Sequence, residues 1–143
     1  MMIESLLPHS KDIVLVDEVL FVDKCSVQTK SVIKDSPFIK DGKFMSYSLI
    51  EIMAQTLGLY KSHIYKKSGA NIAFLIGSRK FEVFLNHLKI GDEIHTKAVL
   101  SLQDESGFGV YDCEVFLGFT LIARAKISVF NPSKEKFLEL KNG

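Results

Sequence analysis

The stretch that decides the fold is "FMSYSLIEIMAQTLGL", residues 44–59. Its apolar residues recur at helical spacing on nearly every side, so we expect a helix from about Tyr47 to Lys66 with Ser46 as its N-cap. A helix that is apolar all round must be wrapped by other elements. Yet Glu51 and Gln55 lie one turn apart on the same face of this helix. A carboxylate in what looks like the most buried helix is unusual and raises the question of why it is there.

Segments typical of strands flank the helix. Residues 26–33 alternate Val, Thr, Ser and Ile with polar neighbours, which is the period of a half-buried strand. Residues 35–45 contain Pro, Gly and Asp and are predicted to form a loop. Another strand-like run precedes the helix at residues 13–23. Four more follow the helix, and we expect them to form an antiparallel meander: 72–85, 92–103, 107–118 and 120–131. This order predicts an α+β domain in which one sheet wraps one helix.

Composition limits the possible functions. The 143 residues are expected to form one domain over 1–143, and 47% hydrophobic residues supply its core. The net charge of +1 and the scattered Lys and Arg give no reason to expect nucleic acid. The chain lacks both an apolar run of about 18 residues and a secretion signal, so we predict a cytoplasmic protein without a membrane segment. Cys25 and Cys113 lie outside any metal-binding spacing, so we expect two free thiols and no metal.

Four motifs carry a resemblance to a known family. They are "LLPHSKDIVLVDEVL" (6–20), "IEIMAQTLG" (50–58), "FLIGSRKFEVFLNHLKIGDEI" (74–94) and "FNP" (130–132). In this order they resemble the hotdog-fold β-hydroxyacyl-ACP dehydratases, and most of all the divergent ApeP-like branch associated with aryl-polyene biosynthesis. The resemblance implies a hotdog fold, in which a curved antiparallel sheet wraps a central helix. It also implies a homodimer with two acyl-thioester sites at its interface.

The resemblance further implies where the chemistry lies. Glu51 falls on the catalytic carboxylate of the family, and the substrate is a thioester on the phosphopantetheine of acyl carrier protein or coenzyme A, with no other cofactor. The family's loop histidine has no counterpart in "SPFIKDGKFMSYS" (36–48). This loop is altered in the divergent branch as well. The second catalytic group is therefore not given by the resemblance.

Dehydration of a 3-hydroxyacyl thioester requires a base for the α-proton, an acid for the departing hydroxyl and a donor to the thioester carbonyl. We expect Glu51 to be the acid and His9 the base, although His9 could instead anchor the N-terminal segment. Gln55 is expected to orient the carboxyl or to bind the substrate hydroxyl. Tyr47, one turn earlier, is expected to line the same pocket. His87 is expected to be a solvated side chain in a turn.

A second set of candidates follows the helix. Gly77 has no side chain and is expected to let substrate approach, while Arg79 and Lys80 could bind the pantetheine phosphate or an acidic carrier protein. A solvated strand face explains these two cations equally well. Ser48 and Glu51 also fit a capping box, which is the structural alternative for the carboxylate.

Three functions are compatible with this sequence. The leading one is a hydro-lyase, a 3-hydroxyacyl-ACP dehydratase of fatty-acid or polyene biosynthesis. The second is a thioesterase on the same fold, in which Glu51 activates water and no histidine is required. The third is a non-catalytic subunit that binds acyl thioesters, paired with another hotdog protein that supplies the missing base.

Overall fold

The computed structural model describes residues 14–65 and 74–130. A 17-residue helix, α1 (Leu49–Tyr65), follows a short 3₁₀ turn at Ser46–Ser48. The strands are β1 (Glu18–Val22), β2 (Ser26–Val32), β3 (Ile39–Lys40), β4 (Lys43–Met45), β5 (Phe74–Val83), β6 (His87–Lys89), β7 (Glu93–Gln103), β8 (Phe108–Leu117) and β9 (Thr120–Phe130). None of the described helices is long and apolar enough to cross a membrane.

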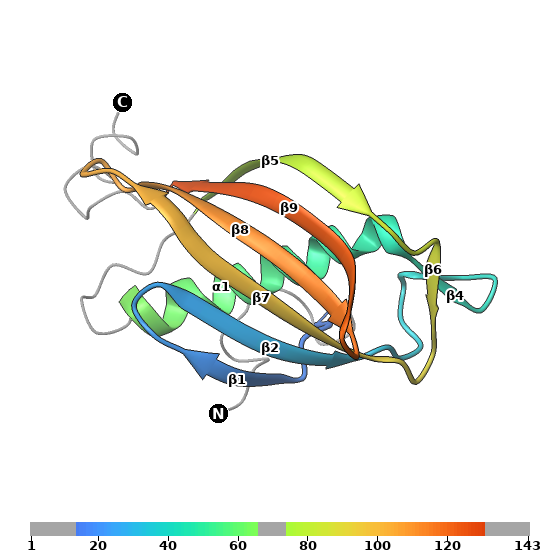
Figure 1. Ribbon diagram of the computed structural model, residues 1–143. Coiled ribbons are helices and arrows are strands. Elements are labelled where there is room, and N and C mark those ends of the chain that lie inside the picture. The colour runs from blue at the N-terminus through green and yellow to red at the C-terminus, as the bar shows by residue number, and fades with distance from the viewer. Residues whose placement is uncertain (1–13, 66–73, 131–143) are drawn as a thin grey trace.

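Six strands form one antiparallel sheet in the order β1-β2-β7-β8-β9-β5, which curves over α1 (Figure 1). β7, β8 and β9 form the predicted meander. β5 does not join it beside β7, and in this respect the sequence prediction is wrong. Instead β5 pairs with the far side of β9. Between β2 and β5 the chain runs through α1 behind the sheet, so β5 joins the edge opposite β1.

The inner face of the sheet packs on α1. In β2, Val27, Thr29 and Ser31 are buried while the residues between them are half-buried, which confirms the predicted alternation. The buried helix residues are Leu49, Ile52, Met53, Gln55, Thr56, Leu57, Leu59 and Tyr60. Ile50, Glu51, Ala54 and Gly58 stay half-buried along one stripe of the helix. Within the described residues the helix is therefore wrapped on most of its surface but not on all of it.

A second sheet, in the order β3-β4-β6, lies at the end of the molecule where α1 begins (Figure 1). It corrects two predictions, because residues 35–45 are not only loop and His87 lies in a strand rather than a turn. Asp41 and Gly42 have φ angles of 53° and 75°, which match the two-residue hairpin turn that joins β3 to β4. Phe44 and Leu88 face each other across β4 and β6 and are buried in the core.

The start of α1 also differs from the prediction. Ser46 does not cap the helix: it is buried in the 3₁₀ turn, and its N–H donates to the carbonyl of Asn86 at 3.1 Å. The chain is thereby tied to the segment between β5 and β6 just before α1 begins at Leu49. The start of the helix is thus fixed by the second sheet.

Candidate active site

The candidate site is centred on Glu51, in the first turn of α1. Its side chain is half-buried, and the helix places Gln55 one turn away on the same face. The amide Nε2 of Gln55 donates a hydrogen bond to Oε1 of Glu51 at 3.2 Å. The structure thus brings together the two residues that the sequence predicted to share a face.

The orientation of the Gln55 amide is fixed from its other end. Its Oε1 accepts the backbone N–H of Leu15 at 2.7 Å and faces that of Val16 at 3.4 Å. Backbone N–H groups can only donate, so the oxygen of the amide must point toward them. The NH₂ group must then point toward Glu51. Gln55, only 1% exposed, therefore fixes the position of the carboxyl group of Glu51.

This arrangement distinguishes the two oxygens of the carboxyl group. Oε1 of Glu51 is an acceptor toward Gln55. When Glu51 is protonated, the proton is therefore favoured on Oε2, and Oε2 is the atom suited to deliver it to a departing hydroxyl. The first N–H of α1, that of Leu49, already donates to the carbonyl of Ser46 in the preceding 3₁₀ turn, so it is not available to a developing oxyanion.

A cleft of about 510 Å³ opens next to the first turn of α1. Phe44 and Ile52 form part of its apolar wall, and Lys34, Asp35 and Ser36 stand on its polar side. Glu51 is not among its lining residues; its chain neighbour Ile52 is. The cleft thus reaches α1 at Ile52, one residue after Glu51. Within this chain, the carboxylate of Glu51 does not line the cleft.

The histidines are distributed unequally around this site. His9 lies outside the described residues, as does the side chain of His63. His95 lies in β7, where Nε2 is 3.3 Å from a carboxylate oxygen of Glu93. His87, opposite Met45 in the small sheet, is half-buried, and its Nδ1 has no hydrogen-bond partner among the described residues. The prediction that His87 is a solvated side chain is therefore wrong.

The other predicted site residues lie apart from Glu51 or on its margin. Tyr47, in the 3₁₀ turn before α1, has 59% of its surface exposed. Gly77, in β5, has open space where a side chain would stand, since an added Cβ would meet nothing within 4 Å. Arg79 pairs in register with Lys126, and Lys80 lies in the following bulge with φ 54°.

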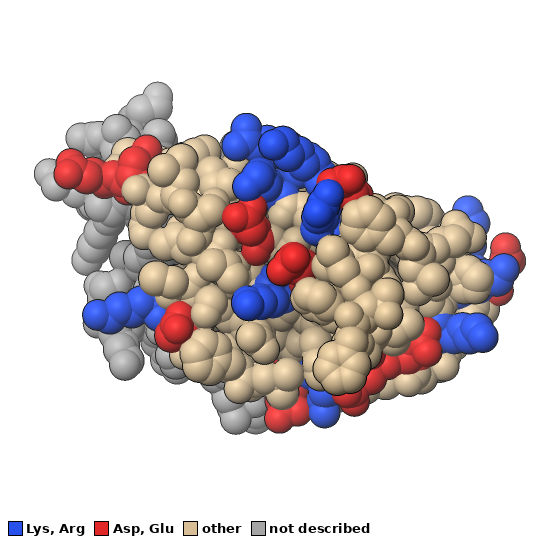
Figure 2. Space-filling model, viewed as in Figure 1, with Lys and Arg blue, Asp and Glu red and all other residues tan. Residues whose placement is uncertain are grey.

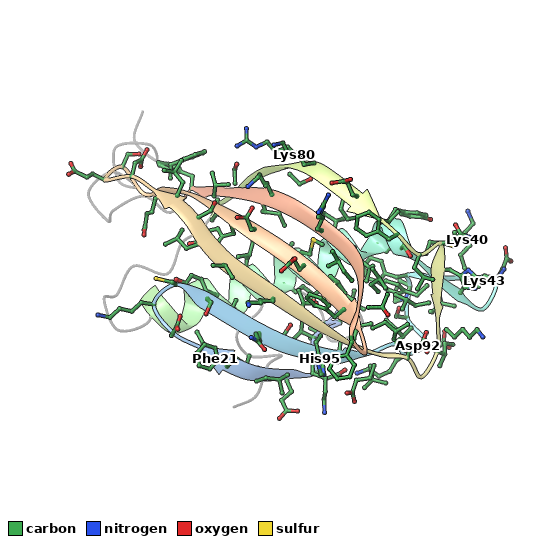
Figure 3. All side chains as sticks on the ribbon, in the orientation of Figure 1. Phe21, Lys40, Lys43, Lys80, Asp92 and His95 are labelled. Carbon is green, nitrogen blue, oxygen red and sulfur yellow. The ribbon has the colours of Figure 1, made fainter. Side chains whose placement is uncertain are left out.

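Arg79 and Lys80 belong to the outer face of the large sheet. Lys80 borders a hollow of about 460 Å³ whose charged lining residues are Glu82, Asp112, Glu114, Arg124 and Lys126. Figure 2 shows cations and anions gathered on this face, and Figure 3 shows Lys80 at its upper edge. Since α1 covers the opposite face, these two cations and Glu51 lie on different sides of the sheet within one chain.

In the part of the chain that the structure describes, no three His, Cys, Asp or Glu side chains are grouped so that they could hold a metal ion. Cys25 is exposed and Cys113 is buried, and both are free thiols. Burial raises the pKa of Cys113 to about 12, with smaller contributions from Asp112 and Glu114. This thiol is therefore protonated at neutral pH and unsuited to nucleophilic chemistry.

A known protein family matches nearly the whole chain. The sequence model of the ApeP-like dehydratases matches residues 1–139. The chain belongs to the ApeP-like dehydratase family. The resemblance inferred from the four motifs is thereby confirmed, as are the α+β hotdog fold and the dehydratase type of enzyme.

Individual relatives agree with this family. The 3-hydroxyacyl-[acyl-carrier-protein] dehydratase FabZ of Chlamydia muridarum is 30% identical over 142 residues, covering 93% of this chain and 92% of the relative. FabZ of Chlamydia trachomatis is 29% identical over 143 residues with the same coverage.

Solved structures show the same fold. A chain of the dehydratase heterocomplex ApeI:P from Xenorhabdus doucetiae superposes with a TM-score of 0.83 at 24% identity, covering 100% of this chain and 99% of that one. A hypothetical thioesterase with coenzyme A from Streptococcus pneumoniae reaches a TM-score of 0.63 at 17% identity, covering 79% and 83%. At these identities the likeness shows the fold alone.

Sequence reasoning missed the backbone partners of Gln55. Leu15 and Val16 lie about 40 positions away in the chain, and their N–H groups carry no sequence signal of an acceptor. The spacing of Glu51 and Gln55 showed that the two could interact. It could not show which end of the amide faces the carboxylate.

Proposed function

We propose that this chain removes water from a 3-hydroxyacyl thioester carried by acyl carrier protein and gives a 2-enoyl thioester. Glu51 protonates the departing hydroxyl from Oε2, and Gln55 holds its carboxyl group in place through Oε1. A base on the other side of the substrate takes the α-proton. The substrate thus loses one proton and one hydroxyl, which together make one water. The substrate thioester carries its own phosphopantetheine, and no further cofactor takes part.

One observation carries this proposal most directly. In a chain of a dehydratase family, the carboxyl group of Glu51 is held by a buried amide whose other end is tied to the backbone. A purely structural carboxylate in a capping box requires no such tether. The carrier-protein substrate is supported by the Chlamydia relatives, which are named for it.

We propose a second hotdog subunit as the partner that completes the site. The half-buried stripe of α1 at Ile50, Glu51, Ala54 and Gly58 leaves room for a neighbour beside the carboxylate. The similar chain from Xenorhabdus doucetiae comes from a dehydratase heterocomplex, which favours a heterodimer over the homodimer expected from the sequence. His9 of this chain and a histidine of the partner are the two candidates for the base. Free thiols fit a cytoplasmic setting.

The test is mass spectrometry of a 3-hydroxyacyl carrier protein incubated with the purified chain, alone and together with a co-expressed hotdog partner. We expect loss of one water from the acyl group. If water is lost only when the partner is present, the base lies on the partner; if the chain alone suffices, the base lies on this chain. Release of the free thiol of the carrier would support a thioesterase instead. An unchanged acyl group in both incubations would overturn the proposed reaction.

A further inference from the structure

The small sheet carries a row of three lysines on one face. Lys40 of β3 lies directly opposite Lys43 of β4, and Lys43 lies directly opposite Lys89 of β6. All three side chains are exposed. The next row of the same sheet contains Ile39, Phe44 and Leu88, of which the last two are buried. Alternation along each strand therefore puts an apolar row inside and an all-lysine row outside.

This row differs from three cations of the large sheet that have acidic partners. Arg124 lies opposite Glu82 with a contact of 2.9 Å, and Lys126 lies opposite Asp112 with a contact of 2.6 Å. Lys30 of β2 likewise reaches an acidic residue, Glu18, at 3.2 Å. These three cations of the large sheet thus lie across from opposite charges, whereas Arg79 lies opposite Lys126.

The three lysines of the small sheet have no such compensation. Among the described residues none of them makes an ion pair. Asp92, which is nearby in sequence, instead accepts the backbone N–H of Lys89 through its carboxylate at 2.9 Å and closes the turn after β6. Like charges directly across a strand pair destabilise a sheet. Such a row is retained at a cost that an anionic partner would offset.

The position of the row connects it with the candidate site. Lys43 immediately precedes Phe44, which lines the cleft beside the first turn of α1. β4 then continues through Ser46–Ser48 into α1 and Glu51. Figure 3 shows Lys40 and Lys43 projecting at the end of the molecule that holds the small sheet, away from the outer face of the large sheet. Because side chains alternate between the two faces of a strand, the three lysines lie on the face of the small sheet opposite to Phe44 and the cleft. A partner bound to the row would therefore lie on the outer face of the small sheet, at the end of the molecule where α1 begins.

We propose that the row of Lys40, Lys43 and Lys89 is the docking surface for the acyl carrier protein, which it binds through a group of surface carboxylates. This inference rests on the proposed function, because it assigns the partner of that same site. Three ammonium groups on neighbouring strands form a linear positive strip, about 5 Å between strands. A carboxylate-rich protein surface matches such a strip better than a single phosphate does. Arg79 and Lys80, on the outer face of the large sheet, have no part in it.

The test measures binding rather than turnover. Fluorescence anisotropy of labelled acyl carrier protein is titrated with the wild-type chain, co-expressed with its hotdog partner where one is required. Lys43→Glu is compared with Lys24→Glu, a matched control on the exposed β1–β2 turn, because both lower the net charge equally. We expect Lys43→Glu to weaken binding about fivefold and the triple reversal Lys40→Glu, Lys43→Glu, Lys89→Glu more than tenfold. Lys24→Glu should change it less than twofold.

A neutral substitution and added salt test whether charge is what binds the carrier protein. Lys43→Gln should weaken binding by less than Lys43→Glu. Wild-type binding should also weaken steeply with added salt, because the Debye screening length is only about 10 Å in 0.1 M salt. Melting curves confirm that each variant is folded. Equal effects of Lys43→Glu and Lys24→Glu, or an unaltered triple variant, would overturn the docking surface. Failure of the wild-type complex to remove water from a 3-hydroxyacyl carrier protein that it binds would instead count against the proposed function, and it would leave the binding result standing.

Discussion

Replacing Gln55 by leucine tests the tether that positions Glu51. Leucine fills a similar volume but leaves the buried N–H of Leu15 without its acceptor at 2.7 Å. One unsatisfied buried N–H costs about 1–3 kcal/mol, and the 3.4 Å contact of Val16 adds little. We therefore expect the free energy of unfolding to fall by about 2 kcal/mol, which for a chain of this length lowers Tm by about 6 °C.

A second variant separates the two ends of the amide. Gln55→Glu keeps an oxygen for the N–H of Leu15 but places a second carboxyl group about 3.2 Å from Glu51. At low pH one of the two carboxyl groups retains a proton and can donate to the other, whereas at neutral pH two ionised groups repel. Because repulsion grows as protons are lost, the free energy of unfolding of this variant should decrease as the pH rises from about 4 to 7.

Urea unfolding of wild type and both variants at pH 4 and pH 7 supplies the measurement. We expect Gln55→Leu to have a lower free energy of unfolding than wild type at both pH values, and Gln55→Glu to have a lower one mainly at pH 7. A Gln55→Leu protein within about 0.5 kcal/mol of wild type would refute the tether. A Gln55→Glu protein equally stable relative to wild type at both pH values would refute the assignment of the amide NH₂ to Glu51.

Two further predictions concern the core and the thiols. The hydroxyls of Thr29 and Thr56 are 2.9 Å apart and buried, so Thr56→Val should lower the free energy of unfolding by about 1–2 kcal/mol, and adding Thr29→Val should recover part of that loss because no hydroxyl is then left unpaired. Of the two cysteines, Cys25 should react with a thiol reagent at pH 8 in the native protein, while Cys113, with its pKa raised to about 12, should react only after unfolding.

Each of these predictions has a clear contrary result. Urea unfolding compares the double valine variant with Thr56→Val. If the double variant is less stable by about a further 1 kcal/mol, the two hydroxyls act independently. Two rapidly reacting thiols in the native protein, counted by mass spectrometry, would contradict the burial of Cys113.

The sequence predicted the elements that are long and regular. The alternation in 26–33 identified β2, and the apolar residues after Leu49 identified α1, because one period repeats several times within each element. β3, β4 and β6 are only two or three residues long, so no period can be recognised in them. The position of β5 beside β9 was missed for another reason: it depends on where α1 carries the chain.

The candidate site was predicted to a similar extent. The four motifs and the spacing of Glu51 and Gln55 indicated where the chemistry lies. The tether of Gln55 to Leu15 was not predictable, since it joins segments 40 residues apart. The row of three lysines was missed because cross-strand register brings together residues that no local pattern connects. The role of His9 as the base remains a prediction, since this residue lies outside the described part of the chain.

The most direct test of the catalytic role of Glu51 is the rate of water loss from a 3-hydroxyacyl carrier protein with wild type, Glu51→Gln and the exposed control Glu105→Gln, each combined with the hotdog partner where one is required. The amide in Glu51→Gln still accepts the hydrogen bond from Gln55, so the fold should persist while the acid is lost. We predict a rate at least about 100-fold lower for Glu51→Gln and an unchanged rate for the control. Wild-type turnover by a folded Glu51→Gln protein would contradict this role.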